Sequence, residues 1–304
     1  MRDQPNTNFG VGDLIALVIP ERIGAGRFLA ASPLAGTPRV FGGQYVAQAI
    51  MAAAQMVGPE RILHRISGDF ILPGRIDGAL DIDVTSLHQG RSFTLCRVDF
   101  RQDDGHLFTA TLSFQAPQEG DAHLGDAPPL PDPLGWPTEE EYLSDIGAAP
   151  DDSPQISPGF FAMFCERRSR SWRDETANVP GPARGSYWTR LAEPLSAHAD
   201  RFDPALEAPL HQALIGYFSD LGLLATGARP LGYGSRHPDT RSASLSHAML
   251  FHAPQRADEW HFSAMTGLGV NRNRASAMAR IYDQDGKAVI TAMQEGVIRH
   301  HSHN

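Results

Sequence analysis

The chain has 304 residues, of which 41% are hydrophobic and 20% charged. These values indicate a globular protein of two domains or one large one, and argue against a disordered or fibrous chain. The net charge of −9 argues against nucleic-acid partners and anionic membranes, because phosphate binding needs a basic surface. Only two cysteines, Cys96 and Cys165, are present, which fits a reducing compartment.

The first apolar run, Leu14 to Ile19, is not expected to be a signal peptide. Asp3 and Asp13 precede it and no A-x-A-like cleavage site follows. No segment approaches the roughly 20 apolar residues that a membrane span needs. We therefore expect a cytoplasmic protein without a membrane span.

A long helix is predicted next, over residues 44–57, directly after the pair Gly42-Gly43. It is rich in strong helix formers and is apolar on almost every side, which is typical of an enclosed helix. Extended segments with alternating or β-branched residues follow it. They predict four strands, at 62–71, 79–88, 92–102 and 106–116.

The middle of the chain has the composition of a linker. Residues 117–158 contain nine prolines and ten acidic residues but no Lys or Arg. Such a segment buries too little apolar surface to offset its ordering entropy. We expect Trp136, Tyr142 and Leu143 to pin it locally. The predicted organisation is a first repeat at 1–116, a linker at 117–158 and a second repeat at 159–304.

The second half follows the plan of the first. Another apolar helix is predicted from Gln212 to about Ala225, and it is followed by four strands at 243–252, 259–268, 274–283 and 287–298. Five pairs of residues are separated by 181 positions: Phe70 and Phe251, Pro73 and Pro254, Arg91 and Arg272, Asp104 and Asp285, Gly105 and Gly286. The helices align at an offset of 168. The sequence therefore predicts an internal duplication, each copy an α+β unit with one long helix wrapped by a curved antiparallel sheet.

These motifs resemble those of the type II acyl-CoA thioesterases, the tandem double hot-dog family. The resemblance covers about residues 14–117 and 160–299 and rests on Phe41-Gly-Gly-Gln44, Phe70-Ile-Leu-Pro-Gly74, Gly90-Arg-Ser-Phe93, Ser113-Phe-Gln-Ala-Pro117, His211-Gln212, Ser219-Asp220-Leu221, Ser246-His-Ala-Met-Leu-Phe-His252 with Pro254, and Gln294-Glu-Gly-Val297. It implies hydrolysis of acyl-CoA thioesters by a water molecule held between an Asp, a Thr or Ser, and a Gln. These family positions fall on Asp220, Ser244 and Gln294.

Some positions depart from the family pattern. Ser244 replaces the expected Thr, which keeps the hydroxyl but loses the methyl that restricts χ1. Ser246-His247 stands where the family commonly has Asp-His, Leu250 where it has an aromatic residue, and Ser67 where some relatives have a histidine. The departures leave acyl-chain length and branching open, while hydrolysis is expected to survive.

The residues themselves support two interpretations of Asp220. A carboxylate within an enclosed helix needs hydrogen bonds or access to water, because burial disfavours its charged form. It either satisfies a structural hydrogen bond or serves as a general base. Gln294 is expected to face inward, because its neighbour Glu295 lies on the opposite face of the strand.

Substrate-binding groups are expected at two places. Backbone N–H groups near Gly43 and Gln44, at a helix N-terminus, suit a developing oxyanion, although the glycine pair is equally explained by a tight turn. The CoA phosphates would need arginines, and Arg91, Arg272 and Arg274 lie near predicted turns. The cluster Arg167, Arg168, Arg170 and Arg173 is ambiguous between a binding role and a solvated surface.

Other activities find little support. The chain has no G-x-S-x-G motif, Gly24-Ala-Gly26 lacks the context of a dinucleotide loop, and His300, His301 and His303 are a weak metal motif. We expect no cofactor and no metal. Two alternatives remain open: a non-catalytic acyl-CoA-binding protein on the same fold, and a hot-dog enoyl-CoA hydratase. A homodimer or higher homo-oligomer is a family expectation only.

Overall fold

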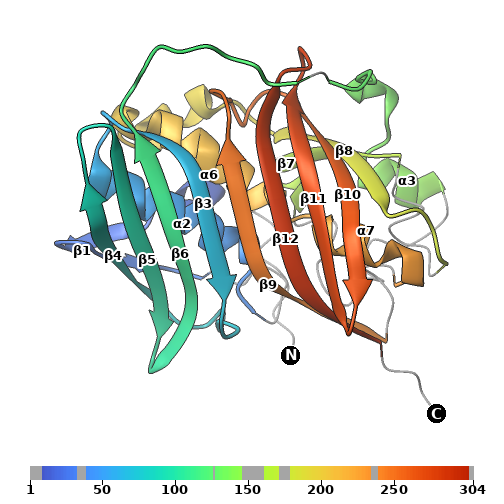
Figure 1. Ribbon diagram of the computed structural model, residues 1–304, viewed down its shortest axis with the longest axis horizontal. Coiled ribbons are helices and arrows are strands. Elements are labelled where there is room, and N and C mark those ends of the chain that lie inside the picture. Colours follow the sequence, from blue (N-terminus) through green and yellow to red (C-terminus); the bar gives the residue numbers. More distant parts are fainter. Residues whose placement is uncertain are drawn as a thin grey trace.

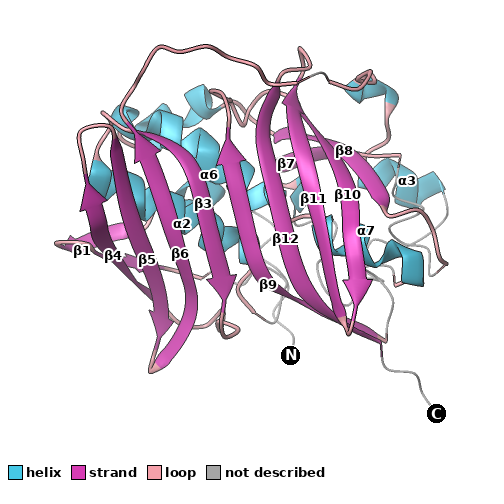
Figure 2. Cartoon of the chain, in the orientation of Figure 1, coloured by secondary structure: helices cyan, strands magenta, loops and turns pink. Residues whose placement is uncertain are grey.

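One large antiparallel sheet with helices on one of its faces forms the body of the molecule. This computed structural model describes residues 9–32, 39–125, 127–145, 161–170, 179–233 and 239–300. Figure 1 shows the strands in front and the helices behind them, and Figure 2 shows the same two layers coloured by secondary structure. The helices of the described residues are α1 (Val11–Val18), α2 (Gly42–Val57), α3 (Glu139–Asp145), α6 (Glu207–Ser219) and α7 (Leu223–Ala228), with 3₁₀ turns at Pro133–Gly135, Leu195–Arg201, Pro204–Leu206 and Arg229–Leu231.

The strand order makes the duplication visible. The sheet runs β1-β2-β4-β5-β6-β3-β9-β12-β11-β10-β8-β7, so each repeat contributes six consecutive strands. The strands are β1 (Glu21–Gly24), β2 (Arg27–Ala30), β3 (Ile62–Phe70), β4 (Leu80–Gln89), β5 (Phe93–Gln102), β6 (Gly105–Gln115), β7 (Cys165–Arg168), β8 (Arg184–Leu191), β9 (Thr240–Phe251), β10 (His261–Asn271), β11 (Arg274–Asp283) and β12 (Ala288–His300). The two repeats meet where β3 pairs antiparallel with β9, Arg65 opposite Leu250 and Asp69 opposite Ser246.

The eight strands predicted after the two long helices are confirmed, with ends that differ by a few residues. Six helices and strands were not predicted: α1, α3 and the outer strands β1, β2, β7 and β8. Three of these strands have four residues each, too few to show an alternating pattern. Helix α1 contains most of the N-terminal apolar run and is buried at Leu14, Ile15 and Val18.

Helices α2 and α6 pack against each other behind the sheet, and this contact explains their apolar surfaces. In α2 every residue from Gly43 to Ala54 is buried. A Cβ atom on Gly216 of α6 would lie 3.1 Å from Val46 Cγ1 and 3.3 Å from Ile50 Cδ1. The small residue therefore allows the two helices to approach closely, and the prediction of enclosed helices is confirmed.

The predicted second helix, from Gln212 to about Ala225, is wrong in one respect that matters for function. Helix α6 ends at Ser219, and α7 begins at Leu223. Between them Gly222 has a φ angle of 83°, the left-handed conformation that glycine adopts without a steric penalty. Asp220 therefore caps the end of α6 and does not lie within a continuous helix.

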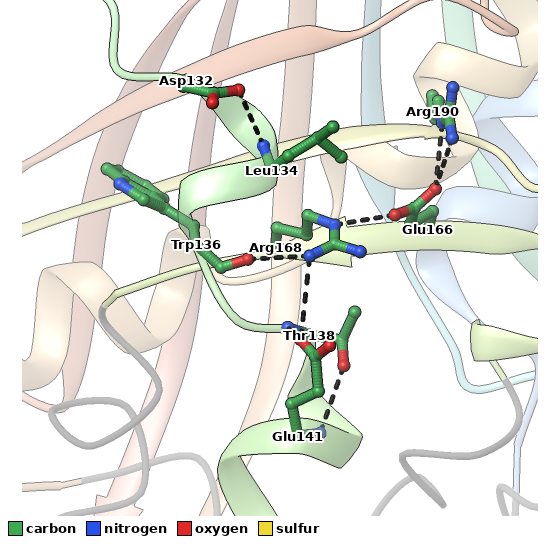
Figure 3. Close-up of polar contacts among 8 residues, drawn as sticks. All are labelled: Asp132, Leu134, Trp136, Thr138, Glu141, Glu166, Arg168 and Arg190. Carbon is green, nitrogen blue, oxygen red and sulfur yellow. Dashed lines mark hydrogen bonds and ion pairs between the residues drawn. The ribbon is translucent and has the colours of Figure 1, made fainter.

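Part of the predicted linker is attached to the second repeat. Trp136 is 7% exposed, and its ring lies 5.8 Å from that of Phe262 in an edge-to-face contact, which confirms that it pins the segment. Figure 3 shows how Arg168 of β7 donates hydrogen bonds to the Trp136 carbonyl oxygen, at 3.0 Å, and to Glu166, at 2.7 Å. Position 126, residues 146–158 and the Leu143 side chain lie outside the described part, and the linker boundaries stay a prediction.

The start of α3 is fixed within the same segment. Thr138 and Glu141 exchange two hydrogen bonds: the Thr138 N–H donates to Glu141 Oε2 at 2.7 Å, and the Glu141 N–H donates to Thr138 Oγ1 at 3.1 Å (Figure 3). This reciprocal pair is a capping box, which satisfies two N–H groups at a helix start. Proline-rich and acidic composition therefore did not prevent this stretch from forming a short helix.

Candidate active site

Three polar side chains from different elements meet near the central strands of the sheet. Asp220 comes from the end of α6, Ser244 from β9 and Gln294 from β12. The Gln294 Nε2 group donates a hydrogen bond to Asp220 Oδ1 and another, 3.0 Å long, to Ser244 Oγ. The structure thus brings together residues that are 74 and 50 positions apart in sequence, the three that the family resemblance selects.

The register between β9 and β12 turns two of these residues toward each other. Gln294 lies opposite His247, while Ser244 lies opposite Gly296, and a bulge between Glu295 and Gly296 shifts the pairing. A bulge places one extra residue on one strand and re-aims the side chains beside it. This irregularity allows the Ser244 hydroxyl and the Gln294 amide to lie within hydrogen-bonding distance.

The amino end of α2 completes the arrangement. The Gly43 N–H donates to Asp220 Oδ2 at 3.0 Å, so the first repeat's helix contacts the second repeat's acid. A Cβ atom on Gly42 would lie 2.6 Å from Asp220 Oδ2, and one on Gly43 would lie 2.2 Å from the Tyr217 carbonyl oxygen. The glycine pair is therefore required for close approach, and the partial positive charge of the helix N-terminus faces the carboxylate.

The electrostatics of Asp220 suit a general base. Burial of the carboxyl group raises its pKa to about 7, although hydrogen bonds from Gln294, Gly43 and Ser244 oppose that increase. As whole residues, Asp220 and Ser244 are partly exposed. A carboxyl group with a pKa near neutrality can both accept and return a proton under physiological conditions.

Gln294 presents an unused acceptor beside the carboxylate. The residue is 1% exposed, and its Oε1 has no hydrogen-bond partner among the described residues. A buried acceptor without a partner is costly, and a water molecule is the usual remedy. A single water can donate one hydrogen to Asp220 and the other to Gln294 Oε1.

The backbone N–H of Gln44 is engaged elsewhere. It donates to the Phe41 carbonyl oxygen at 3.1 Å, and the Gln44 side chain donates to Ser32 Oγ at 3.3 Å and to the Ala31 carbonyl oxygen at 3.4 Å. The Gln44 side chain therefore attaches Ala31 and Ser32 to α2. Of the two predicted backbone donors, the Gly43 N–H is the one in contact with Asp220.

The predicted arginines lie at opposite ends of the sheet. Arg274 is opposite Val297, and Ala275 is opposite Gly296, so the turn with Arg272 lies at the end where Ser244 is found. Arg91 lies in the turn before Phe93, which pairs with Gln115 at the other end of the sheet. At about 3.3 Å per residue, the nine positions of β3 between these ends span about 30 Å. The structure therefore does not bring Arg91 together with Asp220, Ser244 and Gln294.

Of the arginine cluster, the described members have structural partners. Arg168 contacts Glu166 and the Trp136 carbonyl group, Arg167 lies over the Tyr187 ring at 4.3 Å, and Arg170 lies over the Trp136 ring at 5.6 Å. Arg173 lies outside the described residues. The described members therefore attach β7 and Arg170 to Tyr187 of β8 and to Trp136.

The first repeat has no equivalent of this site. The helix offset of 168 relates Asp220 to Ala52, and the strand offset of 181 relates Ser244 to Leu63 and Gln294 to Ser113. None of these three residues is acidic, and two of them are apolar. The described chain therefore contains one Asp/Ser/Gln arrangement, at one of two pseudo-equivalent places.

Sequence reasoning missed two contributors, Gly42 and His247. The Gly42 contact with Asp220 depends on a meeting of two helices that no local pattern specifies, although the glycine pair itself is visible. His247 Nε2 lies 2.9 Å from the Oγ of Ser219, the residue before Asp220. The sequence contained one indication of this contact: the polar pair Ser219-Asp220 interrupts an apolar segment, and His247 lies in a predicted strand.

Comparisons with known proteins agree with this architecture. The family profile of the acyl-CoA thioesterase N-terminal domain matches residues 30–115, and that of the acyl-CoA thioesterase C-terminal domain matches residues 125–298. Acyl-CoA thioesterase 2 of Haemophilus influenzae is 30% identical over 290 residues, which cover 95% of this chain and 98% of that protein. Human acyl-coenzyme A thioesterase 8 is 28% identical over 267 residues, covering 86% and 81% of the two chains.

Solved structures give the same result. Acyl-CoA thioesterase II TesB2 from Mycobacterium marinum superposes with a TM-score of 0.73 at 27% identity, covering 96% of this chain and 99% of that one. A hot-dog-fold protein from Alicyclobacillus acidocaldarius matches with a TM-score of 0.70 at 18% identity, covering 93% and 97%, which supports the fold alone. The fold class is therefore an α+β double hot-dog. The chain belongs to the type II acyl-CoA thioesterase family, and it is an enzyme.

The described residues show neither a metal-binding cluster nor a helix that could span a membrane. They contain no group of three or more His, Cys, Asp or Glu side chains placed to hold a metal ion. In the same part of the chain, no helix combines the length and apolar character needed to cross a membrane.

Proposed function

We propose that the protein hydrolyses acyl-CoA thioesters to a free fatty acid and CoA, with Asp220, Ser244 and Gln294 activating the water. The observation that carries this proposal is the Asp220 carboxylate, held by the Gln294 amide and the Gly43 N–H, with the unused Gln294 Oε1 beside it. These groups form a binding place for one water molecule next to a base.

The reaction begins when this water donates a proton to the Asp220 carboxylate. Its oxygen attacks the thioester carbonyl carbon, and the carbonyl oxygen takes up the negative charge. Ser244 and Gln294 orient the water, which supplies proximity rather than a covalent bond. The tetrahedral intermediate then expels the CoA sulfur, which receives the proton from Asp220. No covalent acyl-enzyme forms.

The oxyanion would be stabilised at the start of α2. In the free enzyme the Gly43 N–H donates to ionised Asp220. Once the carboxyl group has taken a proton it becomes a weaker acceptor, so this N–H is released for the developing oxyanion. The partial positive charge of the 16-residue helix α2 favours the same negative charge.

For the CoA phosphates we propose Arg272 and Arg274. Arg272 lies in the β10–β11 turn and Arg274 begins β11, at the same end of the sheet as Ser244, and Arg274 is paired only loosely, at 3.5 Å, with Glu295. A guanidinium group binds phosphate oxygens in a bidentate manner. The homo-oligomeric state and the cytoplasmic location remain predictions.

The test is thiol release from short, medium and long acyl-CoAs, with crotonyl-CoA hydration measured in parallel. Hydrolysis of at least one chain-length class, with no hydration, is expected. Tight acyl-CoA binding without thiol release over hours would instead indicate a non-catalytic binding protein. Hydration of crotonyl-CoA without thiol release would indicate a hydratase.

A further inference from the structure

A buried histidine lies beside the break between α6 and α7. His247 of β9 is 1% exposed and lies opposite Gln294 in the strand register. Its Nε2 is 2.9 Å from the Oγ of Ser219, which is the last residue of α6. One side chain thus links the strand pair that carries Ser244 and Gln294 to the residue directly before Asp220.

The direction of this hydrogen bond follows from the partners of Ser219. The Ser219 hydroxyl donates its one proton to the Gly216 carbonyl oxygen at 2.8 Å, so it can only accept from the histidine. Burial lowers the pKa of His247 to about 4, so the ring is neutral and carries its proton on Nε2. The His247 Nδ1 is left as an acceptor without a partner among the described residues.

This arrangement is a poor one for stability alone. A buried nitrogen without a partner costs free energy, and an apolar side chain would fill the place without that cost. Met249, two residues further along β9, is fully buried in the hydrophobic core, so the surroundings of this strand accept an apolar side chain. Departures from good packing rules of this kind are expected where function requires them.

The other side of Asp220 is also tied to the sheet. The Tyr187 hydroxyl of β8 donates to the Leu221 carbonyl oxygen at 3.0 Å. Both neighbours of Asp220 in the chain are therefore held by strands, Ser219 by β9 and Leu221 by β8. Helix ends lack internal hydrogen-bond partners and fray unless such contacts hold them.

We propose that His247 is a positioning residue, which acts through Ser219 to fix the end of α6 and thereby the Asp220 carboxylate against Gln294 and Gly43. His247 does not touch the water or the substrate in this role. The inference rests on the proposed function of Asp220 as the base. Displacing a catalytic group by about 1 Å can cost about 10²-fold in rate. A hydrogen bond that holds Asp220 in place can therefore outweigh the cost of burying a histidine.

Three variants and a control test the proposal. His247→Phe removes the donor and keeps a ring of similar size, Ser219→Ala removes the acceptor with a smaller change, and His247→Gln retains an N–H donor. The control is His261→Phe: His261 is 3% exposed, its pKa is lowered to about 4 by burial, and it contacts the Glu259 carbonyl oxygen near the far end of β10. Steady-state kinetics across pH and thermal unfolding are measured for each variant.

We expect His247→Phe and Ser219→Ala each to lower kcat about tenfold or more while KM changes less than about twofold. The acid limb of the kcat profile should move to lower pH, because a loosened carboxyl group becomes better hydrated. The double variant should be no worse than either single one, since both remove the same hydrogen bond. His247→Gln should restore kcat to within about threefold, and His261→Phe should lower stability but leave kcat and its pH profile unchanged.

The proposal is overturned if Ser219→Ala and His247→Phe keep the kcat and pH profile of the wild type. It is also overturned if these variants lose activity only in proportion to their loss of stability and His261→Phe loses activity in the same proportion. Asp220→Asn in the same assay separates the proposed base from the proposed positioning role. If that variant stays active, the proposed base is wrong. If it is inactive while the His247 variants are normal, the positioning role alone fails.

Discussion

The Asp220 carboxylate occupies the space that a side chain at position 42 would need. A Cβ atom on Gly42 would lie 2.6 Å from Asp220 Oδ2 and 3.2 Å from its carboxyl carbon. The contact joins the start of the first repeat's helix to the end of the second repeat's helix. The placement of the acid therefore depends on a residue without a side chain in the other half of the molecule.

Gly42→Ala should consequently displace the carboxylate. We expect kcat to fall by about 10²-fold, the cost of a misplacement of about 1 Å, with a smaller change in KM. Steady-state thiol release measures both constants. Gly269→Ala is the matched control, because a Cβ atom at Gly269 of β10 would meet no atom within 4 Å. Equal, unchanged kcat values in the two variants would show that the close contact is unimportant.

The activity should depend on pH through Asp220. Burial raises the pKa of this carboxyl group to about 7, and a general base works only in its deprotonated form. The value of kcat/KM should therefore rise with pH, reach half its maximum near pH 7, and then level off. A profile of kcat/KM from pH 5 to 9 tests this. A rate that is flat down to pH 5 would be incompatible with a base whose pKa is raised.

Gln294→Leu should change both the rate and the pH profile. The substitution keeps most of the volume but removes the amide that donates to Asp220 and Ser244. Because the Gln294 hydrogen bond lowers the pKa of Asp220, its loss should raise that pKa further and move the acid limb to higher pH. We also expect kcat to fall by about tenfold or more, because the water loses one of its orienting groups. An unchanged midpoint would argue that the amide does not interact with the ionised carboxylate in solution.

The two arginine turns give a paired prediction about CoA. Arg274→Ala should raise KM for acyl-CoA about two- to fivefold with little change in kcat, since an exposed ion pair contributes modestly. The effect should shrink at high salt and be absent with an acyl-pantetheine substrate, which lacks the nucleotide phosphates. Arg91→Ala, at the other end of the sheet, should leave KM unchanged. A larger effect from Arg91 than from Arg274 would place the CoA phosphates elsewhere.

Much of the fold was predictable because helices and strands leave patterns in short stretches of sequence. Periodicity and turn residues gave eight strands and the enclosed helix α2. The break at Asp220 was not predictable in the same way, since apolar residues continue on both sides of it and Gly222 alone marks the change. Edge strands such as β1 are too short to leave a pattern, and β1 is exposed throughout.

The site was predictable only in part. Asp220, Ser244 and Gln294 were selected by the resemblance to a known family, but their hydrogen bonds and the Gly42 contact arise from tertiary packing. Arg91 and Arg272 are equivalent in the duplicated sequence, but the structure places them at opposite ends of the sheet. Since β3 and β9 are antiparallel, equivalent turns of the two repeats lie at opposite ends of the sheet.

The central claim is that Asp220 removes a proton from the attacking water, and the kcat of Asp220→Asn for thiol release tests it most directly. Asparagine keeps the size of the side chain but cannot act as the base, so kcat should fall by about 10²- to 10⁴-fold. Asp99→Asn is the control, another buried acid, 7% exposed, which contacts Arg97 and Thr109 in the first repeat. It should retain the activity of the wild type. A wild-type kcat in folded Asp220→Asn would contradict the account.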